Sequence, residues 1–339
     1  SEKMVTINDI AKYCNVSGAT VSYVLSGKGA EHRISLSTQN QILNAAEELG
    51  YTRKQINSSN NLKIAVYFMY KELEMTIPPL IYGISNVISS EVLPIDLIIR
   101  PYDLGQLSDY KYLWKNGGCN AAIIVAAGIK DLQFLESNKP SVPVVLLNRD
   151  LPGYSSVSID HEEAGRLTAE HAISVGGSDI AVVLNPSTLY GFNLRSSTIF
   201  KICEERGINI KDNLFYGNNQ IDTGYEIGWE MVRKNKLHKV IICMYDMVAM
   251  GIISALNEAG ISVGKDVHVI ATSSGVSSLA ARYTPPITVV DLKMKDISER
   301  CLKLAIALAQ QTITEPQKII VQPSIIYRQS SPMVLPSDL

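Results

Sequence analysis

The side chains most able to do chemistry are scattered along this sequence of 339 residues. No two histidines stand at the spacing of a metal site, and no two cysteines form a C-x-x-C pair. The sequence also lacks a P-loop, a G-x-S-x-G elbow, an H-E-x-x-H motif and a G-x-G-x-x-G segment after its first apolar strand. We therefore expect no catalysis, no metal and no cofactor. The histidines are His32, His161, His171, His238 and His268.

Five cysteines are spread widely, and we expect them to be small buried hydrophobes in a reducing cytoplasm. Near the N-terminus another chemistry is possible, because Ser17, Thr20 and Ser22 lie at the start of a predicted helix. Hydroxyls and unbonded backbone N–H groups at a helix N-terminus suit phosphate oxygens. The formal net charge of the chain is -2, so any field that attracts a polyanion must be local.

Three short helices are predicted to position these hydroxyls within the first 50 residues. Thr6, Ser17 and Ser35 have the side chains of helix N-caps, and Gly50 is suited to end the third helix. Apolar residues recur at helical spacing after each cap. Those expected to face inward are Ile10, Ala11 and Tyr13 in the first helix, Val21, Val24 and Leu25 in the second, and Leu36, Ile42, Leu43, Ala46 and Leu49 in the third.

From Leu62 onward the pattern changes to short apolar strands that alternate with helical segments. Strands that are apolar on both faces and are followed by helices predict parallel α/β layers. The length of this part fits two open sheets better than one. The expected strands are Lys63–Met69, Ile95–Arg100, Ala121–Ala126, Val142–Leu147, Ile180–Leu184, Lys239–Met244, Val267–Thr272 and Ile287–Val290. The expected helices include His161–Val175, Arg195–Arg206, Met247–Ala259 and Asp296–Gln310.

The composition is that of a soluble globular protein, with 46% hydrophobic and 19% charged residues. No stretch approaches the roughly 20 apolar residues of a membrane span. The first ten residues lack the apolar core of a signal peptide. We therefore expect a cytoplasmic protein with no membrane partner.

The segment Thr6–Leu49 resembles the DNA-binding head of the LacI/GalR family of bacterial repressors. This resemblance implies an all-α helix-turn-helix head, double-stranded DNA as a partner and the function of a sequence-specific transcription regulator. The matching residues are Thr6-Ile7-Asn8-Asp9-Ile10-Ala11, Asn15-Val16-Ser17, Ala19-Thr20-Val21-Ser22, Val24-Leu25-Ser26-Gly27, Ile34-Ser35, Thr38 and Ala45-Ala46-Glu47-Glu48-Leu49-Gly50-Tyr51.

By this resemblance the second helix enters the major groove with Gly18, Ala19 and Tyr23 facing the bases. The first two are small and permit close approach, while Tyr23 offers one hydrogen bond where many relatives have a basic residue. His32 and Arg33 in the following loop either add contacts or are simply solvated. The expected DNA-contacting set is Thr6, Ser17, Gly18, Ala19, Thr20, Ser22, Tyr23, His32 and Ile56.

The linker departs from the family pattern, in which a short helix enters the minor groove and a leucine opens a base step. Here the stretch 55–60 is rich in Asn and Ser, and Asn60 stands near the expected leucine. Since Asn and Ser are poor helix formers, either Ile56 supplies the wedge or the DNA kink is weaker.

The body resembles the same family more loosely, at the segments that follow here. They are Val142–Leu147, Val157–Asp160, Ala164-Gly165, Ala169–His171, Asp246–Gly251 and Pro285–Val289. The implied fold is a periplasmic-binding-protein-like pair of α/β lobes with parallel sheets, three crossing strands and a small-molecule effector in the cleft between the lobes.

Within this body, Arg195 matches an arginine that holds the effector in relatives, although a surface salt bridge is the alternative. Asn148 stands at a strand end and either binds the effector or forms a turn. Asp246 suits either the effector or the N-cap of a helix that begins at Met247. Ser273 and Ser274 replace a pair of acids that grip sugar hydroxyls, which favours a phosphorylated sugar or another polar, anionic metabolite over a plain sugar. The expected effector-binding residues are Asn148, Arg195, Tyr245, Asp246 and Ser273.

The expected domains follow from these patterns. The head spans 1–54 and the hinge linker spans 55–61. The body spans 62–339, with an N-lobe of about 62–159 and 291–321 and a C-lobe of about 160–290 and 322–339. The charge of the head is modest, so two heads in a homodimer on a near-palindromic operator are needed for useful affinity. The alternative function, a solute-binding protein with the same body and no DNA role, is disfavoured by the head.

Overall fold

The structure, a computed structural model, describes residues 5–51, 61–69, 77–91, 94–110, 118–186, 190–273 and 277–335. Its contacts divide the chain into two compact units, Ser1–Asn60 and Asn61–Leu339. We call the first unit the head and the second the body, and each is described by itself. Residues 55–60 of the expected hinge linker, with Ile56, lie outside the described residues, whereas Asn61 belongs to the body.

The head consists of short helices that each begin at a hydroxyl side chain, as the sequence predicts. The hydroxyls of Thr6, Ser17 and Ser35 accept hydrogen bonds from backbone N–H groups three residues later, at 3.4, 3.0 and 3.2 Å. Each cap satisfies a donor that the first helical turn leaves without an intrahelical partner. The helices are α1 (Ile7–Cys14), α2 (Gly18–Leu25) and α3 (Leu36–Glu48).

A small apolar core joins these helices through Ile10, Val21 and Ile42, all fully buried. Three expected core residues lie outside it: Tyr13 is 59% exposed, Leu36 76% and Leu43 48%. The inward face of α3 is set by Ile42, Ala45 and Ala46, which turns Leu36 and Leu43 to the outside. Tyr13 instead donates its hydroxyl proton to Glu48 Oε2 at 2.8 Å.

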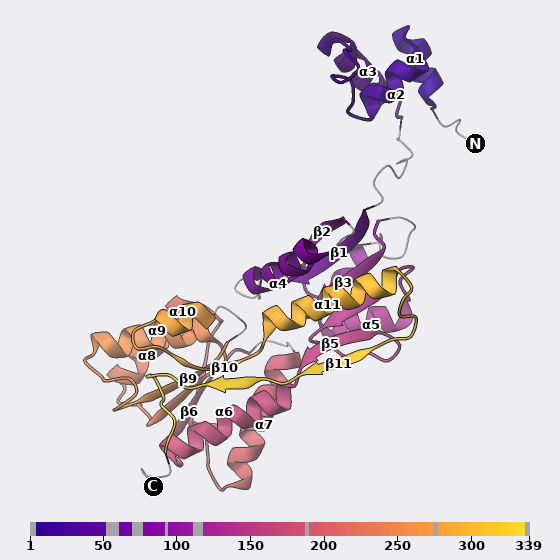
Figure 1. The fold of residues 1–339 in the computed structure, drawn as a ribbon. Helices are drawn as coiled ribbons and strands as arrows, with labels where there is room; N and C mark the ends of the chain where they lie inside the picture. The colour runs from indigo at the N-terminus through magenta and orange to yellow at the C-terminus, as the bar shows by residue number, and fades with distance from the viewer. Residues whose placement is uncertain are drawn as a thin grey trace. The chain divides into compact units, whose positions relative to one another are not determined.

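The first lobe of the body is a parallel sheet with helices on both faces (Figure 1). In the described residues its strand order is β11-β5-β4-β3-β1-β2. Alternate residues of β1 face opposite layers, so Ile64 and Val66 pack in the core with α4 and α11, while Ala65 and Tyr67 share a core with Leu135 of α5. The elements are β1 (Leu62–Met69), α4 (Ile77–Ser90), β2 (Ile95–Tyr102), β3 (Ala121–Val125), α5 (Ile129–Ser137), β4 (Val144–Leu147), β5 (Ser155–Ile159), α11 (Met294–Ala309) and β11 (Lys318–Val321).

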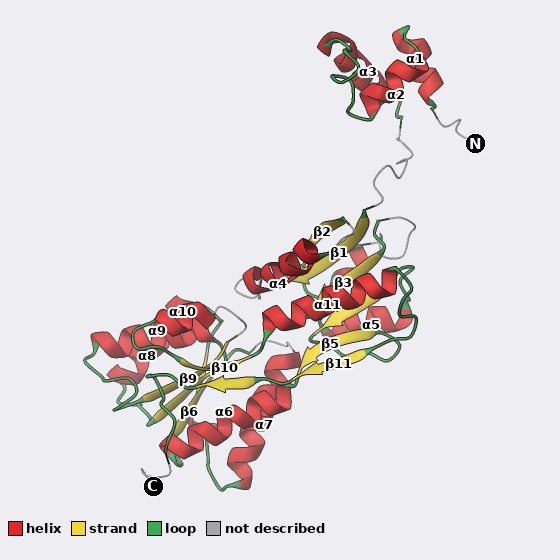
Figure 2. Cartoon of the chain, viewed as in Figure 1, coloured by secondary structure: helices red, strands yellow, loops and turns green. Residues whose placement is uncertain are grey.

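The second lobe repeats this layered design, with helices flanking a second sheet (Figure 2). Within the described part of the chain its order is β12-β10-β9-β8-β6-β7, and all pairs are parallel except β12 with β10. The elements are α6 (His161–Gly176), β6 (Ile180–Leu184), α7 (Tyr190–Glu205), β7 (Leu214–Tyr216), α8 (Ile221–Arg233), β8 (Val240–Cys243), α9 (Asp246–Glu258), β9 (His268–Ser273), α10 (Ser277–Arg282), β10 (Thr288–Asp291) and β12 (Ser324–Ile326).

The chain crosses between the lobes after β5, after β10 and after β11. Each crossing leaves a strand at its carboxyl end. The carboxyl ends of the two sheets therefore face each other where the lobes meet. In parallel α/β sheets this edge is the usual place for ligand-binding residues.

Candidate functional site

In the head, one face of α2 is polar and exposed while the opposite face is packed. Ala19, Ser22 and Tyr23 are exposed, whereas Val21 and Val24 are buried against the other helices. This spacing of three and four residues places the exposed side chains on one stripe of the helix. Such a stripe is what a recognition helix must present to a DNA groove.

The hydroxyls at the start of α2 are partly used within the head. Ser17 Oγ accepts from the Thr20 backbone N–H and lies 2.8 Å from Thr20 Oγ1. Thr6 is likewise the cap of α1, bonded to Asp9 through both its hydroxyl and its backbone N–H. These bonds hold the helix starts and use the Thr20 N–H, so the Gly18 and Ala19 backbone N–H groups are the first-turn donors of α2 suited to a phosphate.

Tyr23 and His32, which the sequence treats as separate candidates, are in contact. Their rings stack with centroids 3.5 Å apart and planes 17° from parallel. His32 lies nine residues further along the chain, and no sequence spacing signals the stack. The structure thus joins two predicted DNA-contacting residues into one exposed unit.

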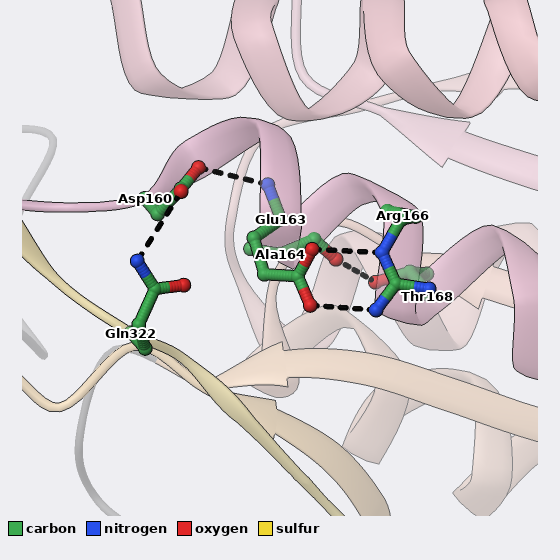
Figure 3. Close-up of polar contacts among 6 residues, drawn as sticks. All are labelled: Asp160, Glu163, Ala164, Arg166, Thr168 and Gln322. Atoms are coloured by element: carbon green, nitrogen blue, oxygen red, sulfur yellow. Dashed lines mark hydrogen bonds and ion pairs between the residues drawn. The ribbon is translucent and has the colours of Figure 1, made fainter.

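In the body, the first and third crossings run together where α6 begins. Asp160 caps α6 by accepting from the Glu163 backbone N–H at 2.9 Å, and it accepts from Gln322 Nε2 at 3.4 Å (Figure 3). The Asp160 backbone N–H also donates to Val321 O at 2.9 Å. These bonds tie the two crossings together beside the facing edges of the sheets.

A cluster of buried basic side chains lies at this boundary. Arg195 on α7 is only 5% exposed and donates from an Nη1 group to His161 Nδ1 at 3.0 Å. The alternative of a surface salt bridge is therefore wrong. Because a guanidinium only donates, His161 must accept at Nδ1 and carry its proton on Nε2. Among the described residues, His161 Nε2 is buried with no hydrogen-bond partner.

Burial and neighbouring positive charges lower the pKa values of the His161 and Arg195 side chains in this cluster. Burial, then Arg195 and Arg149, lower the pKa of His161 to about 2, so the imidazole is neutral. Burial and the nearby Arg149 lower the pKa of Arg195 to about 10, so it stays a cation at neutral pH. Arg149 belongs to the first lobe and Arg195 to the second, and the cluster therefore spans both.

Arg149 and Asn148 form the first-lobe part of this region, directly after β4. The Arg149 guanidinium donates to the carbonyl oxygens of Ala126, Ala127 and Asn148. Asn148 Oδ1 accepts from the Ile159 backbone N–H at 3.1 Å, and its φ of 58° is left-handed. The Asn148 side chain thus has an internal role in holding the end of β4 beside β5.

The second-lobe part follows β8 and β9. Tyr245, Asp246 and Ser273 are all buried, and Ser273 Oγ donates to Asp246 Oδ2 at 2.8 Å. Burial raises the pKa of Asp246 to about 6, against the opposing effect of the Ser273 bond. The helix begins at Asp246 with Tyr245 as its N-cap, so the predicted N-cap position of Asp246 is one residue too late.

The position of Arg195 depends on a glycine of the neighbouring helix. A Cβ on Gly165 would lie 2.7 Å from Arg195 O and 2.8 Å from Thr198 Cβ. Contacts this short do not occur in folded proteins, so α6 and α7 cross here at a distance that only glycine permits.

Sequence reasoning misses His161 and Arg149 as site residues. His161 directly follows the cap of α6 and enters the sequence argument only as a possible metal ligand, while Arg149 does not enter it. The one available signal is their location directly beyond predicted strand ends. Ser274 lies outside the described residues.

Other kinds of site are absent from the part of the chain that the structure describes. It contains no group of three metal-ligating side chains. All five cysteines are free thiols. Among the described helices, none has the length and apolarity needed to cross a membrane.

Comparison with known proteins gives two family matches. Residues 6–54 match the bacterial regulatory proteins of the lacI family, and residues 169–331 match a periplasmic binding protein-like domain. The chain is 22% identical over 334 residues to the HTH-type transcriptional repressor PurR of Photobacterium profundum, covering 96% of this chain and 98% of that protein. It is 25% identical over 333 residues to the HTH-type transcriptional regulator RegA of Clostridium saccharobutylicum, covering 96% and 99%.

Solved structures share the fold. A LacI family transcription regulator from Clostridium acetobutylicum superposes with a TM-score of 0.76 at 24% identity, covering 79% of this chain and all of that one. The lac repressor dimer bound to operator and the anti-inducer ONPF superposes with a TM-score of 0.68 at 20% identity, covering 98% of this chain and all of the repressor chain. The predicted fold, a helix-turn-helix head and a two-lobed body with parallel sheets, is confirmed.

Proposed function

We propose that the chain is a DNA-binding transcription regulator of the LacI family and that it acts in the cytoplasm as a homodimeric repressor. In this proposal two heads bind a near-palindromic operator. A small polar metabolite bound between the lobes of the body controls the affinity for DNA. The proteins to which the chain is similar are regulators, and no catalytic role is proposed.

The observation that carries the DNA-binding part is the exposed stripe of α2. Its N-terminus is capped at Ser17, its outer residues Ala19, Ser22 and Tyr23 are exposed, and its inner residues are packed. Of the predicted contacts, Gly18 and Ala19 permit close approach, Thr20 and Ser22 add hydroxyls, and Tyr23 and His32 supply the larger side chains.

Selection from a random double-stranded DNA library tests this part. Full-length protein is expected to enrich a near-palindromic site, and its affinity for that site should fall steeply with salt as counterions are released. A library that yields no enriched palindrome would contradict the proposal. Affinity that is independent of salt would contradict the phosphate contacts.

We assign effector binding to the boundary between the lobes, where Arg149 of the first lobe lies near Arg195 and His161 of the second. Arg195 provides a buried cation, His161 Nε2 provides a donor, and Asp246 with Ser273 provides a second polar group. Asn148 and Tyr245 complete the predicted set. A guanidinium and a neutral imidazole donor both suit a phosphate or carboxylate, which supports a polar metabolite with an anionic group.

A thermal-shift screen tests the effector part, using sugars, sugar phosphates, nucleosides and nucleobases at fixed protein concentration. A ligand that binds the folded body raises its melting temperature. The same ligand should then change affinity for the selected DNA site. A ligand that stabilises the protein but leaves DNA affinity unchanged would favour a solute-binding role instead.

A further inference from the structure

We propose that His32 is a positioning residue for DNA readout, which holds the ring of Tyr23 so that the Tyr23 hydroxyl meets one base pair in each half-site. The proposal rests on the DNA-binding function proposed above. His32 lies in the loop after α2, and in this proposal it affects DNA binding only through Tyr23 on that helix.

The stack is close and nearly parallel, with ring centroids 3.5 Å apart and an interplanar angle of 17°. Tyr23 is 38% exposed, and in the described head it has no apolar core packing over the face that His32 covers. Aromatic pairs of this kind contribute beyond the area they bury. The imidazole therefore limits the directions that an otherwise exposed tyrosine ring explores.

The loop that carries His32 is anchored to α2 at Tyr23 itself. Tyr23 O accepts from the Lys28 backbone N–H at 2.9 Å and from Ser26 Oγ at 3.0 Å. The His32 backbone N–H then donates to Lys28 O at 3.2 Å. Backbone hydrogen bonds thus connect Tyr23, which is proposed to contact the base, through Lys28 to His32, which supports its ring.

The far side of the loop is anchored to α3. The Ile34 backbone N–H donates to Gly29 O at 2.9 Å, and Gln39 Nε2 donates to Ile34 O at 2.7 Å. A Cβ on Gly29 would lie 2.6 Å from the Gln39 side chain, so the loop lies directly against α3 at this point. Fixed at both ends, the loop presents His32 to Tyr23 in one place.

The reason for such support lies in the chemistry of tyrosine. A phenol makes a single hydrogen bond to a base edge, whereas arginine makes a bidentate pair with guanine. A single bond discriminates between bases only when its direction is held. Of the residues expected to face the bases, Gly18 and Ala19 add no side-chain hydrogen bond, so base readout by this set depends on the direction of Tyr23.

The test uses full-length protein and the DNA site that the wild type selects from a random library. Binding is measured on that site and on versions with single base-pair changes, for Tyr23→Phe, His32→Ala and His32→Phe. Tyr23→Phe identifies the base pair that the hydroxyl reads. We expect His32→Ala to reduce the preference at this base pair about three- to tenfold, the value of one net hydrogen bond.

His32→Phe keeps a stacking ring and should retain the preference. The double variant Tyr23→Phe with His32→Ala should lose no more preference than Tyr23→Phe alone, because the two residues act as a unit. The matched control is Glu31→Ala, an exposed change in the same loop that should leave the preference unchanged.

Four results would overturn the proposal. An equal loss on every site in His32→Ala, with a shallower salt dependence, would make His32 a phosphate contact. An unchanged preference in His32→Ala, or a preference lost equally in His32→Phe, would remove the role of stacking. If the wild type itself enriches no site, the DNA-binding proposal fails and this inference fails with it. Far-UV circular dichroism checks that each variant keeps its helices.

Discussion

The head and the body place their candidate functional residues in opposite environments. In the head, Ala19, Ser22 and Tyr23 are exposed on one helix, and they are close together in the sequence. In the body, Arg195, His161 and Asp246 are buried, and they come from separate segments. The difference fits the partners proposed for the two regions, because a helix that enters a DNA groove must protrude, whereas a small molecule must be enclosed.

This contrast predicts that substitutions in the head change binding with little change in stability, whereas substitutions in the body change both. The exposed side chains of α2 make few packing contacts, so their removal costs little stability. The candidate residues of the body are buried polar or charged groups. Removing one of them leaves its hydrogen-bond partner buried and unsatisfied. The following changes test this division, beginning with the largest expected effect.

Replacement of Arg195 by Ala should weaken effector binding by about 2–5 kcal/mol if the effector forms a desolvated charge pair with the guanidinium. Isothermal calorimetry with the effector found by the thermal-shift screen measures the loss. The matched control is Arg206→Ala, which removes an exposed arginine that pairs with Glu170 just beyond the same helix. DNA binding without effector should persist, because the head is unchanged.

Unchanged effector affinity in a well-folded Arg195→Ala protein would end the assignment of Arg195. A fall in melting temperature together with loss of both activities would instead make Arg195 a structural residue. That result would also contradict the proposed division, in which a substitution in the body leaves DNA binding by the head intact.

Replacement of Asp246 by Asn should stabilise the body near neutral pH, by on the order of 2–3 kcal/mol. The folded pKa of about 6 lies above the ordinary value of 3.8, so the folded state binds the proton more tightly than the unfolded state. The contribution of Asp246 to stability is therefore full below about pH 4 and is lost as pH rises through 6. The amide introduced by Asp246→Asn does not titrate, so the variant lacks this dependence on pH.

Urea unfolding between pH 4 and 8 measures the effect. Both tryptophans, Trp114 and Trp229, belong to the body, so tryptophan fluorescence follows its unfolding selectively. Ser273→Ala removes a bond that lowers the pKa of Asp246 and should therefore extend the loss to higher pH. A wild-type protein with no loss of stability between pH 4 and 6 beyond that of Asp246→Asn would refute this account.

Replacement of Tyr23 by Ala should cost about 1–3 kcal/mol on the selected DNA site and weaken one base preference. Fluorescence anisotropy on selected and random DNA measures both. The melting temperature of the protein should change little, since the ring lies outside the buried core of the head. An equal loss on selected and random DNA would assign Tyr23 to the DNA backbone or to packing.

The smallest effect is expected at the surface of α6. Arg166 makes two bonds to Glu163, of 2.7 and 2.6 Å, but the side chains are 50% and 30% exposed (Figure 3). Exposed ion pairs contribute less than about 1 kcal/mol, and Arg166→Ala should therefore leave urea unfolding and both binding activities almost unchanged. A loss above about 2 kcal/mol would show that burial is not what separates strong from weak contacts in the body.

Sequence patterns predict the two regions unequally well. The head helices are local structures, and Thr6, Ser17 and Ser35 mark their starts. The inward face of α3 depends on packing with the other helices, and this is why the sequence pattern places Leu36 and Leu43 wrongly. The long apolar strands of the body are also recognisable from the sequence.

Four strands are not predicted by the sequence pattern, and they are β5, β7, β11 and β12. β7 and β12 have three residues each, β5 contains three serines, and β11 is partly exposed at the end of the first sheet, so none has an apolar run long enough to stand out. The candidate effector site is also only partly predictable from the sequence. Family spacing points to Arg195 and Asp246, but contact between Arg195 and His161 arises only when α6 and α7 cross.

The crossing of α6 and α7 also gives the proposed effector site a determinant that lies outside its polar side chains. Gly165 fixes how near α7 approaches, and the backbone it touches is that of Arg195 itself. A methyl group there would push the arginine along with its helix and so alter the imidazole contact without removing any polar atom. If the proposed effector site is the true one, its ligand preference can change at this position through helix spacing alone, while every charged residue of the site stays the same.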